Sequence, residues 1–185
     1  MSILIMSGGA VGRSWLLVGA MAASASVAVA QPDSDAERLR CEGAAKDWAP
    51  VRLPAAGVDL AIPCNDGELS AYKNATEERK RIEGLAGCER AGRTYTVMYL
   101  VNTPAGFFDR FASAWKASPA QNFQVVGHRV FRAAAVAGGE AKGQQLIEID
   151  ASRSVLMLSR SKVSDDADFA KLTSCFFNTL HVVTP

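Results

Sequence analysis

The sequence predicts one α+β domain in which helices pack on a mostly antiparallel sheet. Two observations predict this class. The elements read along the chain follow the order strand, undecided helix, strand, helix, strand, hairpin, helix, which mixes both types within one unit. Residues 143–162 read as two β-strands joined by a tight turn, and strands joined in this way are antiparallel. The sequence shows no internal repeat that would predict a second domain.

Residues 1–30 have the organisation of a secretory signal peptide. Arg13 is their only charged residue, an apolar run follows at residues 15–21, and Ala28-Val29-Ala30 matches the small-residue cleavage pattern. Gly19 interrupts the apolar part, which is too short and weak for a membrane anchor of ~20 apolar residues. We therefore expect an exported mature protein, either periplasmic or secreted.

The mature chain of about 155 residues is long enough to bury one core. Residues 31–56 are predicted to form a polar N-terminal extension with a short helix near residues 33–41. Residues 57–185 are predicted to form the α+β domain.

The charge of the mature chain excludes two classes of partner. All 19 acidic residues follow Ala30, and only Arg13 of the 20 basic residues precedes it, so the mature chain is neutral. A nucleic-acid-binding protein needs a basic patch that releases counterions, and a membrane-surface protein needs a polybasic segment. No later apolar run reaches membrane-spanning length, so no membrane span is expected in the mature chain.

Four cysteines, Cys41, Cys64, Cys88 and Cys175, all lie in the exported part. An even number in an oxidising compartment predicts two disulfides, for which three pairings are possible. We favour Cys64–Cys88, which flanks a polar excursion, and this choice leaves Cys41–Cys175 to tie the N-terminal segment to the last helix. No C-x-x-C motif or zinc-ligand spacing is present, so the cysteines are expected to be structural.

The first half of the domain contains two clear strands. Apolar residues alternate in residues 57–64, and Pro63 ends this strand. Residues 68–81 allow a helix with a charged surface, whereas residues 82–88 carry two glycines and favour extended structure, so this region stays open. β-Forming residues occupy both faces of residues 93–101, which predicts a central strand.

Two amphipathic helices are predicted. Thr103 is a suitable N-cap and Pro104 suits the first helical position. Oxygen-bearing side chains at Ser164, Asp165 and Asp166 predict the start of the last helix. Each helix has an apolar stripe at helical spacing, formed by Phe107, Phe108, Phe111, Ala112 and Trp115 in the first and by Phe169, Leu172, Cys175 and Phe176 in the second.

The remaining β-structure lies between these helices. Residues 122–136 read as one extended stretch with a possible bulge at Gly127, and residues 137–142 read as a loop. In the following hairpin, residues 144–149 and 154–160 are the strands and residues 150–153 the turn, where Asp150 can accept a backbone hydrogen bond. The second strand is apolar on both faces and is therefore expected inside the sheet.

The succession of strand 57–63, strand 95–100, the helix from Thr103, the 143–162 hairpin and the last helix resembles the PsbP-like proteins. That family is a small α/β/α sandwich around an antiparallel sheet and includes exported bacterial proteins. The resemblance implies a non-enzymatic accessory or binding module. It carries no functional residues onto this chain, because it lies in the order of the elements.

Candidate catalytic residues are few. His128 has the titration range of a general base, but the sequence contains no G-x-S-x-G nucleophile elbow for it to activate. His181 lies near the C-terminus. Glu148 and Asp150 alternate onto one strand face and form a candidate carboxylate pair by geometry, although we favour their interpretation as exposed hairpin residues.

Cofactor and metal sites are not indicated. Asp165, Asp166 and Asp168 cluster locally, yet they lack the spacing of a calcium loop, and helix capping explains them. Gly138, Gly139 and Gly143 lack the lysine and serine of a P-loop. We therefore assign no catalytic, cofactor or metal-binding residue and expect no cofactor.

These observations favour an exported, disulfide-stabilised, non-catalytic binding or accessory protein of the bacterial cell envelope, with a protein or a small ligand as its partner. The alternative is a periplasmic hydrolase that uses His128 or a spatially assembled carboxylate pair. A structural envelope component that acts through oligomerisation is a third hypothesis. A deep pocket containing His128 beside a Ser or Asp would favour the enzyme, whereas a shallow apolar surface patch would favour binding.

Overall fold

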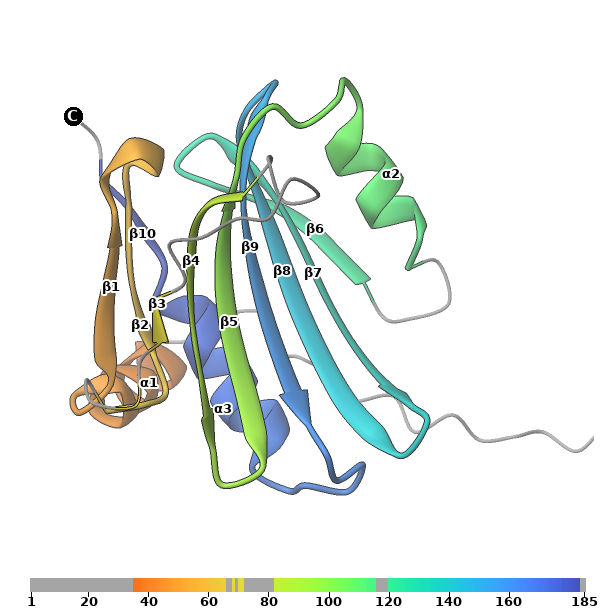
Figure 1. The fold of residues 1–185 in the computed structure, drawn as a ribbon. Coiled ribbons are helices and arrows are strands. Elements are labelled where there is room, and N and C mark those ends of the chain that lie inside the picture. The colour runs from red at the N-terminus through yellow and green to blue at the C-terminus, as the bar shows by residue number, and fades with distance from the viewer. Residues whose placement is uncertain (1–34, 66–67, 69, 72–81, 116–119, 184–185) are drawn as a thin grey trace, which may run out of the picture.

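The protein was analysed as a computed structural model, which describes residues 35–65, 68, 70–71, 82–115 and 120–183. The predicted signal peptide, residues 1–30, lies outside the described residues. Within them the chain forms two antiparallel sheets and three short α-helices, so it is β-rich (Figure 1). The predicted α+β class is therefore wrong. Additional strand residues lie in three segments for which the sequence predicted or allowed other structure. These segments are the extension 31–56, the region 68–81, where a helix was an alternative, and the loop 137–142.

The larger sheet has seven strands in the order β3-β4-β5-β9-β8-β7-β6, and all neighbours are antiparallel. Its central strand β9 lies between β5 and β8, as the apolar character of both its faces predicted. The strands are β3 (Ser70–Ala71), β4 (Ile82–Arg90), β5 (Arg93–Leu100), β6 (Ala120–Val125), β7 (His128–Ala137), β8 (Glu140–Asp150) and β9 (Arg153–Ser161).

The smaller sheet has three strands in the order β1-β2-β10. Strand β1 (Ala49–Leu53) pairs with β2 (Val58–Ile62) across a short 3-10 helix, and β10 (His181–Val182) pairs with the other edge of β2. Strand β1 belongs to the segment that the sequence analysis separated as an N-terminal extension. The first and last strands of the described chain therefore lie in one sheet.

Three α-helices complete the structure: α1 (Asp35–Ala45), α2 (Phe107–Ser113) and α3 (Phe169–Asn178). Figure 1 shows α1 and α3 on one side of the large sheet, together with the small sheet. Helix α2 connects β5 to β6 and packs on the opposite side. We call the side that faces α3 and the small sheet the inner face, and the side that faces α2 the outer face.

The inner face carries the main core. Alternate residues of the large sheet project toward it, and they meet Val58, Leu60 and Ile62 of the small sheet and Phe176 and Phe177 of α3. Tyr95 contacts Phe176 edge-on, with ring centroids 5.4 Å apart. The buried residues that the large sheet contributes are Ala86, Cys88, Tyr95, Val97, Tyr99, Val130, Ile147, Val155 and Met157.

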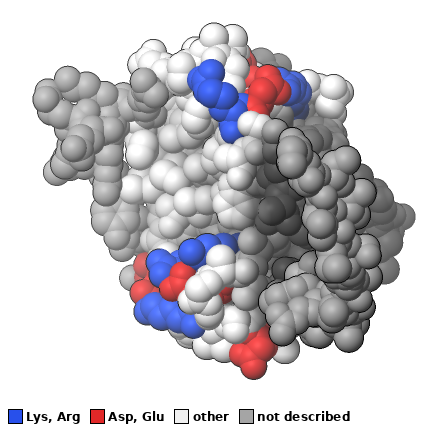
Figure 2. Space-filling model, turned by 90° about the vertical axis from the view of Figure 1, so that its right-hand side faces the viewer, with Lys and Arg blue, Asp and Glu red and all other residues white. Residues whose placement is uncertain are grey.

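The outer face has a smaller core beneath α2. Phe108 of the helix packs with buried residues of four strands, namely Leu100, Phe131, Ala133, Leu146 and Leu156. On the side of the molecule seen in Figure 2, the charged side chains of the described residues gather in two groups, and the described surface between these groups is formed by other residues. Together with the buried residues beneath it, helix α2 forms a second, smaller apolar layer on one part of the outer face.

Glycine chemistry explains why the 137–142 loop prediction is wrong. Gly138 (φ 62°) and Gly139 (φ 78°) form a two-residue turn, and Ala137 pairs directly with Glu140. Two successive positive φ values match the turn that suits the right-handed twist of hairpin strands. Val126 and Gly127 form a similar turn, which divides the predicted extended stretch 122–136 into β6 and β7.

Both helices begin later than predicted. The Thr103 N–H donates to the Ser152 carbonyl across the sheet, and α2 begins only after Gly106. The Asp166 carboxylate accepts hydrogen bonds from Arg93 and Ser161, and α3 begins at Phe169. At α3, the carboxylate that was predicted to cap the helix is therefore engaged in tertiary hydrogen bonds.

Two disulfides join the layers, as the even number of cysteines predicted. Cys41 of α1 is bonded to Cys175 of α3, and Cys64 after β2 is bonded to Cys88 of β4. These are the pairs favoured in the sequence analysis. The first disulfide fixes α1 on α3, and the second fixes the small sheet beside the large one.

Helix α3 approaches the sheet closely at Gly143 of β8. A Cβ at this position would lie 2.6 Å from both Ser159 Oγ and Thr173 Cγ2. We expect Gly143→Ala to lower the free energy of unfolding by about 1–3 kcal/mol, because the helix must move away from the sheet. Gly43→Ala is the control, since no atom lies within 4 Å of its Cβ. Urea unfolding of both variants measures the difference, and equal stabilities would contradict this packing.

The Arg93–Asp166 pair predicts an acid-sensitive contribution to stability. The Arg93 guanidinium donates to both Asp166 oxygens at 2.6 and 2.5 Å and, against partial burial, lowers the pKa of Asp166 to about 2. The resulting stabilisation, about 2 kcal/mol, is fully present above the ordinary aspartate pKa and is lost as the pH falls from about 4 to about 2.

Urea unfolding of Asp166→Asn against pH measures this contribution. We expect the variant to be less stable than the wild type at pH 6 and the difference to shrink in acid. Asp165→Asn, at an exposed neighbouring position, should change stability by less than about 0.5 kcal/mol. A pH-independent difference for Asp166→Asn would show that its carboxylate does not supply the effect.

Candidate functional site

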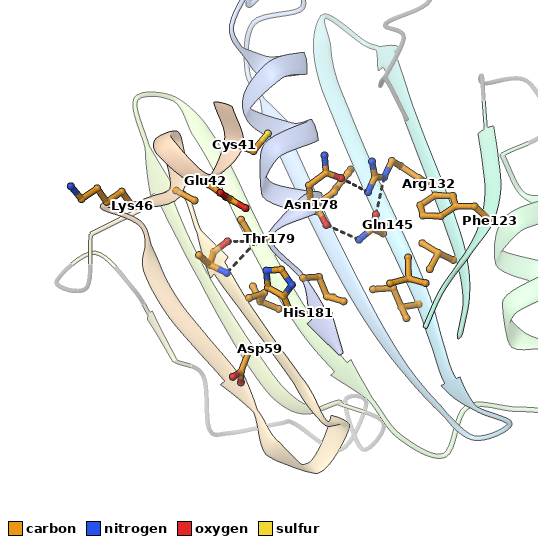
Figure 3. Close-up of a pocket in the computed structure, with 18 residues that line it drawn as sticks. Cys41, Glu42, Lys46, Asp59, Phe123, Arg132, Gln145, Asn178, Thr179 and His181 are labelled. Carbon is orange, nitrogen blue, oxygen red and sulfur yellow. Dashed lines mark hydrogen bonds between the residues drawn. The ribbon is translucent and has the colours of Figure 1, made fainter. Parts of the chain in front are cut away.

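A cavity lies between the two sheets, where the inner face extends beyond α3. Its volume is about 590 Å³, within the ~300–1,000 Å³ range of small-molecule sites. Strands β6, β7 and β8 form one wall, and the end of α3, strand β2 and the end of α1 form the other walls (Figure 3). We call this space the inter-sheet cavity.

A cluster of three polar side chains stands at one end of the inter-sheet cavity. Arg132 Nε donates to Gln145 Oε1 at 2.8 Å, and Arg132 Nη2 donates to Asn178 Oδ1 at 2.9 Å. Gln145 Nε2 donates to the Phe177 carbonyl oxygen at 3.1 Å. We call Arg132, Gln145 and Asn178 the polar cluster. It connects two adjacent strands of the sheet to the last residue of α3.

The hydrogen-bond chemistry determines how both amides of the polar cluster are oriented. A guanidinium group only donates, so the amide oxygens of Gln145 and Asn178 must face Arg132. A backbone carbonyl only accepts, which requires the Gln145 amide nitrogen at Phe177. Asn178 Nδ2 is buried and has no hydrogen-bond partner among the described residues.

Arg132 is held between aromatic rings as well as amides. Its guanidinium carbon lies 5.3 Å from the centroid of Phe123 and 5.5 Å from that of Phe177. Both distances are within the range of cation–π attraction. Only 3% of Arg132 and 2% of Gln145 is exposed. Burial of a guanidinium requires such compensating contacts, and they hold its planar group in one orientation.

Away from the polar cluster the cavity walls are mainly apolar. Val125 of β6, Val130 of β7 and Ile147 of β8 contribute side chains from the large sheet, and Leu60 and Leu180 contribute them from the opposite side. Val130 and Ile147 are directly paired in the sheet register, so they form a continuous apolar surface. The large-sheet wall therefore has one polar end and is otherwise apolar. The other walls also include four ionisable residues, Glu42, Lys46, Asp59 and His181.

The wall opposite the large sheet depends on contacts at the end of α3. Thr179 Oγ1 accepts from the Ala61 N–H at 3.1 Å and donates to the Ala61 carbonyl at 2.9 Å, which fixes β2 to the helix. Cys41 lines the cavity and is held there by its disulfide. Figure 3 shows Lys46 and Asp59 at the side remote from Arg132, directed away from the polar cluster.

His128, the predicted general base, lies outside this site. It is the first residue of β7, and its Nδ1 is 3.2 Å from the Glu148 carbonyl oxygen. It lines neither the inter-sheet cavity nor the shallower one beside α2, which is formed partly by Asp109, Asn122 and Arg129. His181, by contrast, is exposed and lines the inter-sheet cavity.

The predicted carboxylate pair is divided between two arginines. Glu148 accepts from Arg129 at 3.3 Å, and Asp150 accepts from Arg153 at 2.5 Å. An irregularity in the β8–β9 register lies between the two acids. A hydrogen bond from the Ser152 N–H, together with Arg153, lowers the pKa of Asp150. A general acid requires the opposite shift.

The acidic and glycine clusters have structural partners. Asp166 binds Arg93 and Ser161, Asp168 lies 4.0 Å from Arg93, and Gly138 and Gly139 form the β7–β8 turn. Among the described ranges, no group of three or more His, Cys, Asp or Glu side chains is arranged to hold a metal ion. The described helices include none that is long and apolar enough to cross a membrane.

The sequence analysis did not identify the polar cluster. Arg132 and Gln145 interrupt the apolar alternation of two stretches that both read as strands. This interruption is the only sequence feature here that could have indicated a buried polar pair. Recognition of the pair required the β7–β8 register, in which Arg132 is directly opposite Gln145. Asn178 comes from a helix far along the chain, so only tertiary packing brings it to the cluster.

Comparisons with known proteins assign no family. No family model matches the chain, and no curated protein matches it. One similar solved structure, a 1.50 Å crystal structure of a Bacteroides thetaiotaomicron protein, has a TM-score of 0.41 and 10% sequence identity. The match covers 74% of this chain and 48% of that one, so this chain spans about half its length. A likeness of this degree carries no argument about fold or function.

Removal of the Cys41–Cys175 disulfide should destabilise the protein and loosen the α1 wall. These cysteines are 134 residues apart, and a bridge of this kind contributes about 2–5 kcal/mol. We expect the double serine variant to unfold at lower urea concentration and to be cleaved faster by protease within α1. The control is the double serine variant of Cys64 and Cys88, which are only 24 residues apart and whose loss should be smaller. An unchanged unfolding midpoint for the first variant would contradict the prediction.

Proposed function

We propose that this chain is an exported, disulfide-stabilised, non-catalytic protein that binds a small, largely apolar molecule in the inter-sheet cavity. The observation that carries the proposal is the cavity itself. It combines an apolar body with a few convergent polar groups, which is the usual composition of a small-molecule site. The sequence allows either a protein or a small ligand as the partner, and the cavity favours the small ligand.

The construction of the walls supports binding rather than a packing defect. A disulfide, the Thr179 hydrogen bonds and the polar cluster fix the three sides of the cavity. A site with fixed walls loses little conformational entropy when a ligand enters, and this favours affinity. The two disulfides and the signal-like N-terminus support function outside the cytoplasm. The resemblance to PsbP-like proteins implies the same non-catalytic class.

The test is binding of a neutral apolar fluorescent probe, N-phenyl-1-naphthylamine, to the mature protein. We expect saturable fluorescence enhancement for the wild type. Val125→Trp should weaken binding at least about 10-fold, because an indole in place of the half-buried valine fills the cavity. Val163→Trp is the matched control, since Val163 is 54% exposed and does not line the cavity.

Two outcomes would contradict the proposed function. One is a wild-type protein that produces no saturable enhancement with the probe. The other is equal probe affinity in Val125→Trp, Val163→Trp and the wild type, which would place the probe elsewhere on the surface. Thermal melting of each variant shows whether it is folded during the measurement.

A further inference from the structure

We infer that two copies of this chain pair through strand β6, the edge strand of the large sheet, in an antiparallel arrangement around a two-fold axis. The two large sheets then continue across the interface as one sheet. This inference goes beyond the proposed function and does not depend on any ligand. Its basis is the contrast between β6 and the other edge strands of the described chain.

Three of the four edge strands in the described part of the chain carry features that oppose pairing with a further strand. Strands β3 and β10 are only two residues long, and β1 contains Pro50 and Arg52. Short edge strands, prolines and charged side chains are the usual means by which proteins protect sheet edges.

Strand β6 has none of these features. It is six residues long and lies at the end of the large sheet, next to β7 (Figure 1). Its residues, Ala120–Val125, include no proline and no charged side chain, and the β6–β7 register runs without a bulge. An edge of this kind presents a row of unpaired backbone groups to which another strand can bind.

The turn after β6 determines which backbone groups face the free edge. Val125 and His128 flank a two-residue turn and form a hydrogen-bonded pair, and bonded and non-bonded pairs alternate from there along the two strands. The N–H and C=O groups of Phe123 therefore point to β7, whereas those of Asn122 and Gln124 point away from it. Within the described ranges no backbone hydrogen bond outside the sheet ladder reaches Asn122 or Gln124, and both residues are exposed.

The side chains of β6 suit pairing with a second copy of the same strand. Phe123 and Val125 line the inter-sheet cavity on the inner face, whereas Asn122 and Gln124 line only the shallower cavity on the outer face. Residues directly opposite in an antiparallel pair share one face. A two-fold axis through Phe123 places this ring opposite its own copy, Asn122 opposite Gln124, and Gln121 opposite Val125. The pairing therefore joins two aromatic rings on one face and neutral amides on the other.

Charge and exposed apolar surface also favour a second copy as the partner. A two-fold axis brings each charged side chain of a strand close to its own copy, and like charges across a strand pair are destabilising. Strand β6 contains no charge. Val126, which follows it, is 64% exposed, the largest value among the exposed large hydrophobic residues of the described chain. The same axis places Val126 next to Ala120 of the second copy, which removes apolar surface from water. Because both copies use the same strand and the other edges are protected, the assembly is complete at two copies.

The first measurement is the oligomeric state of the mature, disulfide-bonded protein by sedimentation velocity over a dilution series. We expect a monomer–dimer equilibrium with a dissociation constant of roughly 1–100 μM, because one strand pair is a small interface. No species larger than the dimer should form. A wild type that remains monomeric up to about 1 mM would overturn the inference and leave the β6 edge to a strand of another protein.

Substitutions at Asn122 locate the interface. Asn122→Pro removes the N–H that points to the free edge and leaves the hydrogen bonds to β7 in place, so the dissociation constant of the dimer should rise at least about 10-fold. Asn122→Ala keeps this N–H and should change the constant by less than about 3-fold. Asn122→Lys adds a charge to the edge without altering the backbone and should also weaken the dimer. Val163→Lys is the matched charge control, since Val163 is 54% exposed and lies outside β6.

Amide hydrogen exchange of the wild type supplies a readout that does not depend on the folding of any variant. Exchange at Asn122 and Gln124 should slow as the protein concentration passes the dissociation constant, because these N–H groups become bonded in the dimer. Exchange at Phe123 and Val125, which are already bonded to β7, should stay unchanged. A dimer that protects none of these amides, or that forms equally well in Asn122→Lys and Val163→Lys, would use another surface, and the inference would be wrong.

Discussion

The constraint on which this structure depends is the need to cover the apolar inner face of a seven-stranded sheet. No single element covers it. Helix α3 packs so closely on β8 and β9 that only glycine fits at Gly143, and the small sheet packs beside β4 and β5. The strands at the other edge, β6 and β7, extend beyond both covers. The inter-sheet cavity is the space that this incomplete coverage leaves.

The same constraint explains why the polar cluster is built as it is. Arg132 and Gln145 face the core side of the sheet, where an isolated polar group would be strongly destabilising. Each gains partners from its neighbour strand and from the end of α3. The cluster thus fastens the helix to the sheet and also lines one end of the cavity.

Connections between distant segments hold the covers in place. The Cys41–Cys175 disulfide holds α1 on α3, the Cys64–Cys88 disulfide holds the small sheet beside β4, and Arg93–Asp166 fixes the segment before α3. These contacts join parts that the backbone alone leaves independent. They also limit how far the walls of the cavity can separate, which supports a site with a defined shape.

The sequence by itself determined the features that depend on local chemistry: the alternating strands 57–64 and 93–101, the 143–162 hairpin with its Asp150 turn, and an even set of cysteines. Both helices begin later than predicted, and the Asp166 carboxylate, which was predicted to cap the last helix, is bonded to the distant Arg93. Tertiary structure alone decided the β-rich class and the polar cluster. Strand pairing and the meeting of Arg132, Gln145 and Asn178 depend on contacts between residues far apart in the chain, which periodicity does not encode.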